Sequence, residues 1–120
     1  MKQFKIVKAY QATENMSKCE KLDAETLWSI YQLRKKLYPH VEFQAEREDA
    51  LREKYAEFAD EDGVIKGEPY TNYVKDLSEI ATMDKEVNIP DKITIKLQDE
   101  MGITVQMMEA LDEFVNFVKE

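Results

Sequence analysis

Residues 58–77 read FADEDGVIKGEPYTNYVKDL and contain two of the chain's three glycines and one of its three prolines. Gly63 and Gly67 can adopt positive φ, and Pro69 suits the first turn of a helix. The stretch therefore predicts a chain reversal over residues 60–69 that joins two antiparallel helices. A short piece of strand is expected at the tip, where the sequence reads VIK.

The acids that precede Gly63 raise the alternative of a metal or phosphate site. An EF-hand loop needs oxygen ligands at its positions 1, 3, 5 and 12, with glycine at position 6. With Gly63 at position 6, Phe58 falls at position 1 and Pro69 at position 12. A loop that starts at Asp60 puts Ile65 at position 6, so neither register fits. The glycine spacing of a phosphate loop is missing as well, and we expect no metal and no cofactor.

A long helix is predicted before the turn, over residues 24–59, because apolar residues keep largely to helical spacing there. Asp23 suits its N-cap, and Glu25 lies in the first turn, where the helix dipole favours an anion. Pro39 removes one backbone hydrogen bond, so it either kinks this helix or splits it in two. Because no turn residues flank Pro39, a kink is favoured.

The remaining chain predicts a mainly α fold with a small β element, in a single domain over residues 1–120. The long helix and a returning helix form an antiparallel hairpin. Alternating apolar residues predict a short β-hairpin or ribbon, and Thr104 suits the N-cap of a C-terminal helix. The further elements are expected at residues 4–20 (helix), 70–84 (returning helix), 86–97 (β segment) and 104–118 (C-terminal helix).

The charge of the chain is uneven, with a net value of −8. Residues 1–41 carry eight bases and four acids, residues 42–62 three bases and nine acids, and residues 63–120 six bases and twelve acids. Direct binding to nucleic acid or to an anionic membrane is not expected, because both need clustered Lys and Arg. A basic protein surface is a plausible partner, and solubility alone is the alternative explanation of the acids.

Two groups of residues are candidates for interaction. The first is an apolar stripe on the predicted C-terminal helix, whose methionines adapt to varied partner surfaces; packing in the chain's own core is the favoured alternative. The second is an acidic face on the long helix and its tip. The stripe comprises Met107, Met108, Phe114, Phe117 and Val118, and the acidic face comprises Glu46, Glu53, Asp60 and Asp62.

No catalytic residues are expected. His40 has no second histidine or cysteine near it and is read as structural or exposed. Cys19, the one cysteine, is read as a small buried apolar residue in a reducing compartment. Glu48 and Arg52 have the spacing of a helical ion pair. The aromatic residues could form a ligand pocket, although a helical core or an interface is the more common role; they are Trp28, Tyr31, Tyr38, Tyr55, Tyr70 and Tyr73.

The order of these elements resembles a family of small proteins from tailed phages and prophages. The resemblance lies in the long helix with its proline, LRKKLYPHVEFQAERE, in VNIPDKITI and in MEALDEF. Its most telling pieces are Val87-x-Ile89-Pro90 and Met108-x-Ala110-Leu111. It implies a phage origin, a place among structural or tail genes and no catalytic residues.

Two functions are therefore expected in order of preference. The first is a non-enzymatic interaction protein in virion or tail assembly or in an accessory structural role, with phage structural proteins or further copies of the chain as partners. The second is an acidic inhibitor that presents carboxylates to a host nucleic-acid-binding or defence protein. In both cases the chain is expected in the cytoplasm of the bacterial host, in the first case also in the virion.

Overall fold

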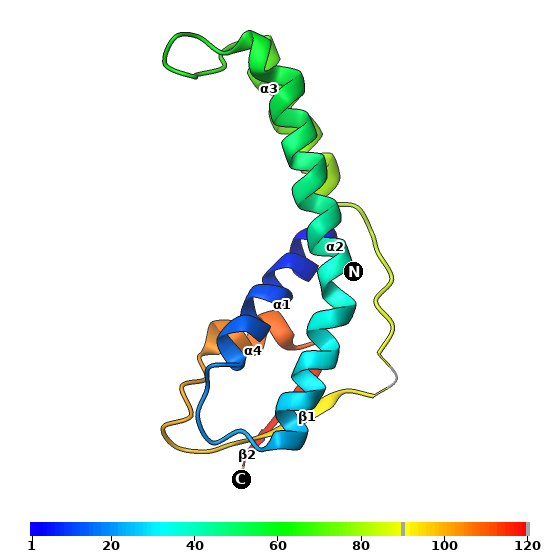
Figure 1. Cartoon of the computed structure of the whole chain (residues 1–120), viewed down its shortest axis with the longest axis vertical. Helices are drawn as coiled ribbons and strands as arrows, with labels where there is room; N and C mark the ends of the chain where they lie inside the picture. The colour runs from blue at the N-terminus through cyan, green and yellow to red at the C-terminus, as the bar shows by residue number, and fades with distance from the viewer. Residues whose placement is uncertain (90, 120) are drawn as a thin grey trace.

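The computed structural model describes residues 1–89 and 91–119 and shows an elongated molecule (Figure 1). Its principal extents are 55 × 29 × 18 Å, and its radius of gyration is 18.0 Å, compared with about 14 Å for a compact domain of this length. The elements in chain order are α1 (Gln3–Met16), α2 (Ala24–Tyr55), the 3-10 turn η1 (Ala56–Phe58), α3 (Glu68–Ala81), β1 (Ile93–Leu97), α4 (Val105–Leu111) and β2 (Val115–Lys119).

The molecule has two parts that share α2. We call residues 42–83 the arm; it contains the second half of α2, η1, the tip loop and α3. We call the remaining described residues the body, in which α1 packs against both α2 and α4 and the strands lie behind the lower half of α2 (Figure 1). Each part has its own apolar cluster.

The long helix begins as predicted, with the side chain of Asp23 accepting a hydrogen bond of 2.7 Å from the backbone N–H of Thr26. Its 32 residues run through Pro39 without a break, so the alternative of two separate helices is wrong. Instead α2 curves along its length (Figure 1). Pro39 and Lys35 are exposed, and water can therefore hydrate the Lys35 carbonyl that loses its helical partner. The α-helix ends at Tyr55, and η1 extends it to Phe58.

The reversal and the returning helix are confirmed, with shifted bounds. Gly67, at φ 73°, is the N-cap of α3, and proline follows in the first turn. α3 then packs back on α2 around Leu51, Tyr55 and Ile80. It ends at Ala81 rather than at residue 84, because the chain there turns to the N-terminus: the Met83 carbonyl accepts from the Gln3 backbone N–H at 2.9 Å.

The C-terminal part differs from the prediction. The helix expected over residues 104–118 ends at Leu111, and Val115–Lys119 forms β2. β2 pairs in parallel with β1, in the register Ile93 opposite Val115. Phe114 and Val115 become almost completely buried, at 3% and 2% exposed. Their apolar spacing fits a short helix or a strand equally well, and pairing with β1 decides for the strand.

The predicted β-hairpin over residues 86–97 is also wrong. Only Ile93–Leu97 forms a strand, and its partner is β2, with α4 as the crossover between the two. Parallel strands require such a crossover, which a local hairpin cannot supply. Val87 and Ile89 are half-buried and pack on the body's core as extended chain. Pro90, part of the sequence resemblance, lies outside the described residues.

The first helix ends earlier than predicted, at Met16 rather than residue 20, and a loop with Lys21 at φ 69° connects it to α2. Ile6, Ala9 and Met16 are fully buried and supply much of the body's core. Thr13 is buried as well, and its hydroxyl accepts from the guanidinium of Arg34 on α2 at 3.1 Å. This contact is one of several polar contacts that join α1 to α2.

Candidate functional site

The predicted apolar stripe at the C-terminus is divided between several elements. Met107 and Phe114 are buried in the body, at 6% and 3% exposed, and Met108 and Phe117 are half-buried. Val118 is exposed at 39% on the edge of β2. Because the chain changes from helix to strand within this segment, the five side chains do not share one face, and most of them pack inside the chain.

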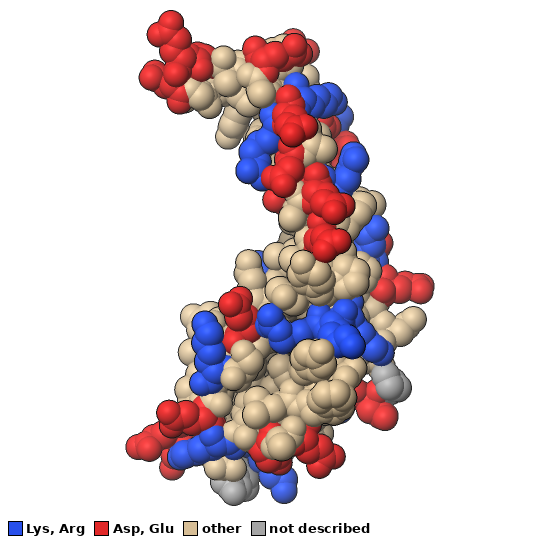
Figure 2. Space-filling model, in the orientation of Figure 1, with Lys and Arg blue, Asp and Glu red and all other residues tan. Residues whose placement is uncertain are grey.

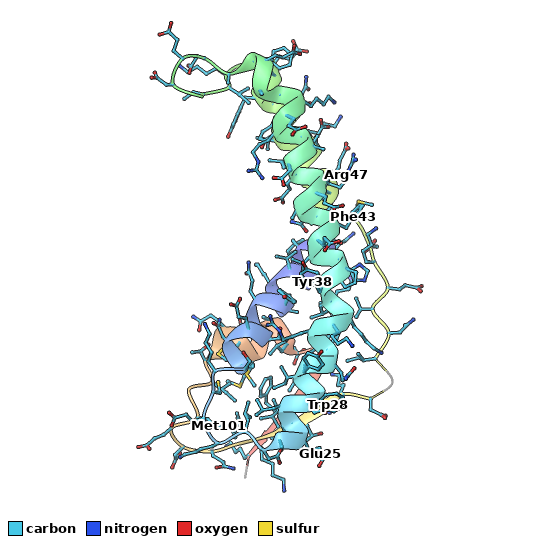
Figure 3. All side chains as sticks on the ribbon, in the orientation of Figure 1. Glu25, Trp28, Tyr38, Phe43, Arg47 and Met101 are labelled. Carbon is cyan, nitrogen blue, oxygen red and sulfur yellow. The ribbon has the colours of Figure 1, made fainter. Side chains whose placement is uncertain are left out.

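A cleft of about 1190 Å³ lies between α1 and α4 and is bordered by the loop that leads into α4. Met101, labelled in Figure 3, lies in this loop. The cleft is larger than the 300–1,000 Å³ that is usual for small-molecule sites. Its apolar lining comes from Phe4 and Ala12 on α1, Met101 in the loop, and Met107 and Ala110 on α4.

The two walls of the cleft carry opposite charge. The α1 side and the residues after it supply three lysines, Lys5, Lys8 and Lys18, against one carboxylate, Glu20. The α4 side and the flanking loops supply four carboxylates, from Glu100, Glu109, Asp112 and Glu113. Among the residues that the structure describes, no ion pair within 4.0 Å joins the two walls. The cleft therefore presents separate cationic and anionic edges on either side of an apolar strip.

The exposed side of α2 forms a second surface, which we call the front face of α2. It consists of side chains three or four residues apart along the helix: Trp28, Tyr31, Lys35, Tyr38, Glu42, Glu46, Asp49 and Glu53, all exposed. In Figure 1, α1 lies beside the lower half of α2, and α3 lies behind the upper half. Figure 2 shows acidic side chains along the arm, and basic and uncharged side chains over the lower half of the helix.

The lower half of the front face is aromatic. Trp28 is 62% exposed, and its ring lies 5.4 Å from that of Tyr31. The ammonium group of Lys35 lies 5.6 Å from the centre of the Tyr31 ring, which is within the range of a cation–π contact. Beside them, the Arg34 guanidinium donates a hydrogen bond of 3.1 Å to the hydroxyl of Tyr10.

The aromatic residues do not converge on one pocket. Trp28, Tyr31 and Tyr38 lie on the front face of α2 and are about half exposed or more. Tyr55 and Tyr73 are in the arm, where their rings make an edge-to-face contact with centroids 5.2 Å apart, and Tyr70 is exposed on α3. Wide separation along the arm and body rules out a shared ligand pocket for this set.

The predicted acidic residues are all exposed, but they lie in two places. Glu46 and Glu53 belong to the front face of α2, whereas Asp60 and Asp62 lie in the tip loop of the arm. The expected pair of Glu48 with Arg52 does not form. Arg52 instead contacts Asp49 at 2.5 Å, and Glu48 accepts from the amide of Gln44 at 3.0 Å.

The tip loop is closed by its own hydrogen bonds. Oδ1 of Asp60 accepts from the backbone N–H groups of Asp62 and Val64, both at 2.9 Å. The Asp60 N–H in turn donates to the Val64 carbonyl at 2.9 Å, and Gly63 adopts φ 78°. An isolated antiparallel bridge joins Ala59 to Ile65. It corresponds to the short piece of strand that was expected at VIK, residues 64–66. The carboxylate of Asp60 therefore serves the turn.

The single histidine and the single cysteine are both half-buried. Burial raises the pKa of the Cys19 thiol, which disfavours the reactive thiolate. Burial, and to a lesser extent the charge of Lys85, lowers the pKa of His40. The backbone carbonyl of His40 accepts a hydrogen bond from the side-chain amide of the buried Gln3 at 2.5 Å. His40 thus lies where the start of α1 packs against the middle of α2. Cys19 lies at the edge of the cleft.

Searches for similar proteins found no matching family, no matching curated protein and no matching solved structure. Within residues 1–89 and 91–119, no cluster of three or more His, Cys, Asp or Glu side chains has the arrangement of a metal site. None of the described helices combines the length and apolar character needed to span a bilayer. The cleft and the front face of α2 are the two surfaces on which functional inference rests.

Proposed function

We propose that this chain is a non-enzymatic interaction protein that binds a segment of a partner protein in the cleft between α1 and α4. The observation that carries this proposal is the pairing of an apolar strip with edges of opposite charge. An amphipathic helix could place its apolar side between Phe4 on α1, which is 36% exposed, and the half-buried Ala110 on α4, in the helix-in-groove mode. Acids along one of its edges would face Lys5 and Lys8, and bases along the other would face the α4 side.

The charged edges would set the direction in which such a segment lies. A segment turned end for end would bring its acids to Glu109 and Glu113 and its bases to the lysines. Like charges brought together at an interface cost several kcal/mol, so one direction would be strongly preferred. The apolar strip would then form the buried centre of the interface, and the charged edges would form its polar rim.

The setting that we propose is the assembly or accessory structure of a tailed phage virion, with a virion structural protein as the partner. The support is the sequence resemblance, which includes the MEALDEF segment, residues 108–114, at the end of α4 and directly after it. This segment contributes Glu109 and Ala110 to the cleft.

The experiment is affinity purification of the tagged full chain from infected or lysogenic cells. Lys5→Glu/Lys8→Glu reverses two charges in the cleft, and Lys66→Glu/Lys75→Glu makes the same charge change on exposed positions of the arm. We expect a virion structural protein to be retained by the wild type and by the arm variant and to be lost by the cleft variant. Equal retention by all three, or retention of no virion protein, would overturn the proposal.

A second candidate function is inhibition of a basic host protein, such as a nucleic-acid-binding or defence protein. The observation that favours it is the exposure of carboxylates on the arm, including Glu46, Glu53 and Asp62. Arg52 and Lys54 pair with Asp49 and Asp76 on the same arm and reduce its net charge, so we rank it second. Its test is binding to the captured basic protein at rising salt: a steep loss of affinity supports it, and affinity that salt leaves unchanged excludes it.

A further inference from the structure

The front face of α2 has two chemically different halves. The lower half, from Trp28 to Tyr38, is aromatic with a lysine. The upper half presents carboxylates at the same three- and four-residue steps, at Glu42, Glu46, Asp49 and Glu53. Both halves are exposed, although Trp and Tyr are among the residue types that contribute most to the affinity of protein interfaces.

The net charge of α2 changes sign along the helix. Residues 24–41 contain three bases and one acid, whereas residues 42–55 contain five acids and three bases. Two such helices laid side by side in parallel would bring like halves together. In the antiparallel arrangement, each basic and aromatic half would meet an acidic half, so the face is complementary to a second copy of itself.

The spacing of the side chains agrees with this arrangement. A two-fold axis that crosses the helix between His40 and Val41 places Lys35 opposite Glu46 of the second copy. The same axis places Trp28 opposite Glu53 of the second copy, where the indole N–H could donate to a carboxylate. A two-fold relation forms each contact twice, as in other isologous interfaces.

The surrounding elements leave most of this face free: the ring of Tyr38 lies 6.0 Å from that of Tyr10 on α1, and Tyr38 is still 49% exposed. In Figure 3, α2 is uncovered toward the viewer from Trp28, past Tyr38, to Arg47. The body packs on the opposite side of the helix, through Ile30, Leu33 and Leu37. A helix could therefore lie along about 38 Å of α2, the length of 25 residues at 1.5 Å each.

We propose that two copies of the chain associate through the front faces of their α2 helices, in antiparallel orientation about an axis near residue 40. The arm of each copy then lies over the body of the other. This dimer goes beyond the proposed function, because none of the α2 residues that would form it lines the α1–α4 cleft. Failure of the dimer would leave the cleft proposal intact, and failure of the cleft proposal would leave the dimer intact.

The test is the mass of the purified chain by light scattering or sedimentation over a range of concentrations. We expect the wild type to approach twice the 14.1 kDa of one chain. Lys35→Glu and Glu46→Lys each bring like charges together twice, so each variant alone should dimerise about tenfold more weakly or worse. Lys96→Glu, the matched charge change at an exposed position of β1 behind α2, should dimerise as the wild type does.

Mixing the two variants gives the decisive measurement. In a mixed pair, Glu at position 35 of one copy meets Lys at position 46 of the other, and the unchanged Glu46 meets the unchanged Lys35. The mixture should therefore recover the dimer that neither variant forms well alone. A wild-type chain that stays at 14.1 kDa at every concentration overturns the proposal, as do single variants that dimerise normally or a mixture that fails to recover.

Both substitutions are at exposed positions, so the fold should survive them. Helical circular dichroism equal to that of the wild type will confirm this for each variant. Recovery on mixing is a second safeguard, because two misfolded chains would not regain a specific dimer.

Discussion

Tyr55 on α2 donates a hydrogen bond of 2.6 Å from its hydroxyl to a carboxylate oxygen of Asp76 on α3. The contact joins the two helices of the arm close to the tip, beside the small apolar cluster of Leu51, Tyr55 and Ile80. Lys54 lies 3.7 Å from the same carboxylate. Asp76 on α3 therefore receives polar contacts from two residues of α2, Tyr55 and Lys54.

The Tyr55 contact should make the stability of the arm depend on alkaline pH. The hydrogen bond to Asp76, then burial and the charges of Asp76 and Glu79, raise the pKa of Tyr55 in the folded state. The stabilisation is thus fully present below the ordinary tyrosine pKa of about 10, and it is lost as the pH rises through the folded value. We expect the urea midpoint of the wild type to fall more steeply above pH 10 than that of Tyr55→Phe.

Tyr70→Phe, on the exposed side of α3, is the control for this prediction and should follow the wild type. Parallel curves for the wild type and Tyr55→Phe would contradict the prediction.

The body and the arm should respond differently to loss of a buried side chain. Leu37 is fully buried in the body, and Leu37→Ala should lower the free energy of unfolding by about 2–5 kcal/mol. Ile80 is one of three buried residues in the arm, and Ile80→Ala should open the arm locally. Hydrogen exchange will separate the two cases: backbone amides of α3 should exchange faster in Ile80→Ala while those of α1 stay protected. Equal acceleration in both helices would mean that arm and body unfold together.

Pro39 should be a site where substitution stabilises the chain. Proline in a helix interior is about 3 kcal/mol less favourable than alanine, and α2 continues through Pro39 with the Lys35 carbonyl left without its helical donor. Pro39→Ala restores that hydrogen bond. The more flexible unfolded chain offsets about 0.4–1 kcal/mol, so we expect a net gain of about 1–3 kcal/mol in denaturant unfolding. Pro69→Ala is the matched control: Pro69 is in the first turn of α3, where no helical bond is missing, and the control should show no gain.

The sequence allowed the long helix, the reversal and the returning helix to be predicted, because their signals are local. Asp23 fixes the start of α2, and Gly67 with Pro69 fixes the start of α3. The residues of the front face of α2 also recur at helical spacing in the sequence, but nothing in the sequence marks them as exposed. The importance of this face could not be judged until the structure showed which side of the helix the body covers.

The C-terminal strand and the cleft could not be predicted, because both depend on residues far apart in the chain. The strand partners Ile93 and Val115 are separated by α4, and the apolar pattern of 114–118 fits helix and strand alike. The cleft forms only when α1 and α4, from opposite ends of the chain, pack together. Lys8 and Glu109 then line one cavity, which no local pattern of charge reveals.

The single histidine should make the chain less stable in mild acid. Burial, then the charge of Lys85, lowers the pKa of His40 below its ordinary value of 6.5 in the folded state. The unfolded chain therefore binds a proton first as the pH falls below 6.5, and the free energy of unfolding decreases until the folded protein is protonated as well. The side-chain amide of Gln3 donates to the backbone carbonyl of His40, so His40→Gln leaves that contact in place.

Because the chain has one histidine, His40→Gln isolates this effect. We expect the urea midpoint of the wild type to fall between pH 7.5 and pH 5.5, and that of His40→Gln to stay nearly constant over the same range. Carboxylates titrate mainly below this window and contribute little to the difference. An equal fall in both proteins would show that the pKa of His40 is the same in the folded and the unfolded chain. The packing of α1 against α2 at this point would then have no effect on the ionisation of His40.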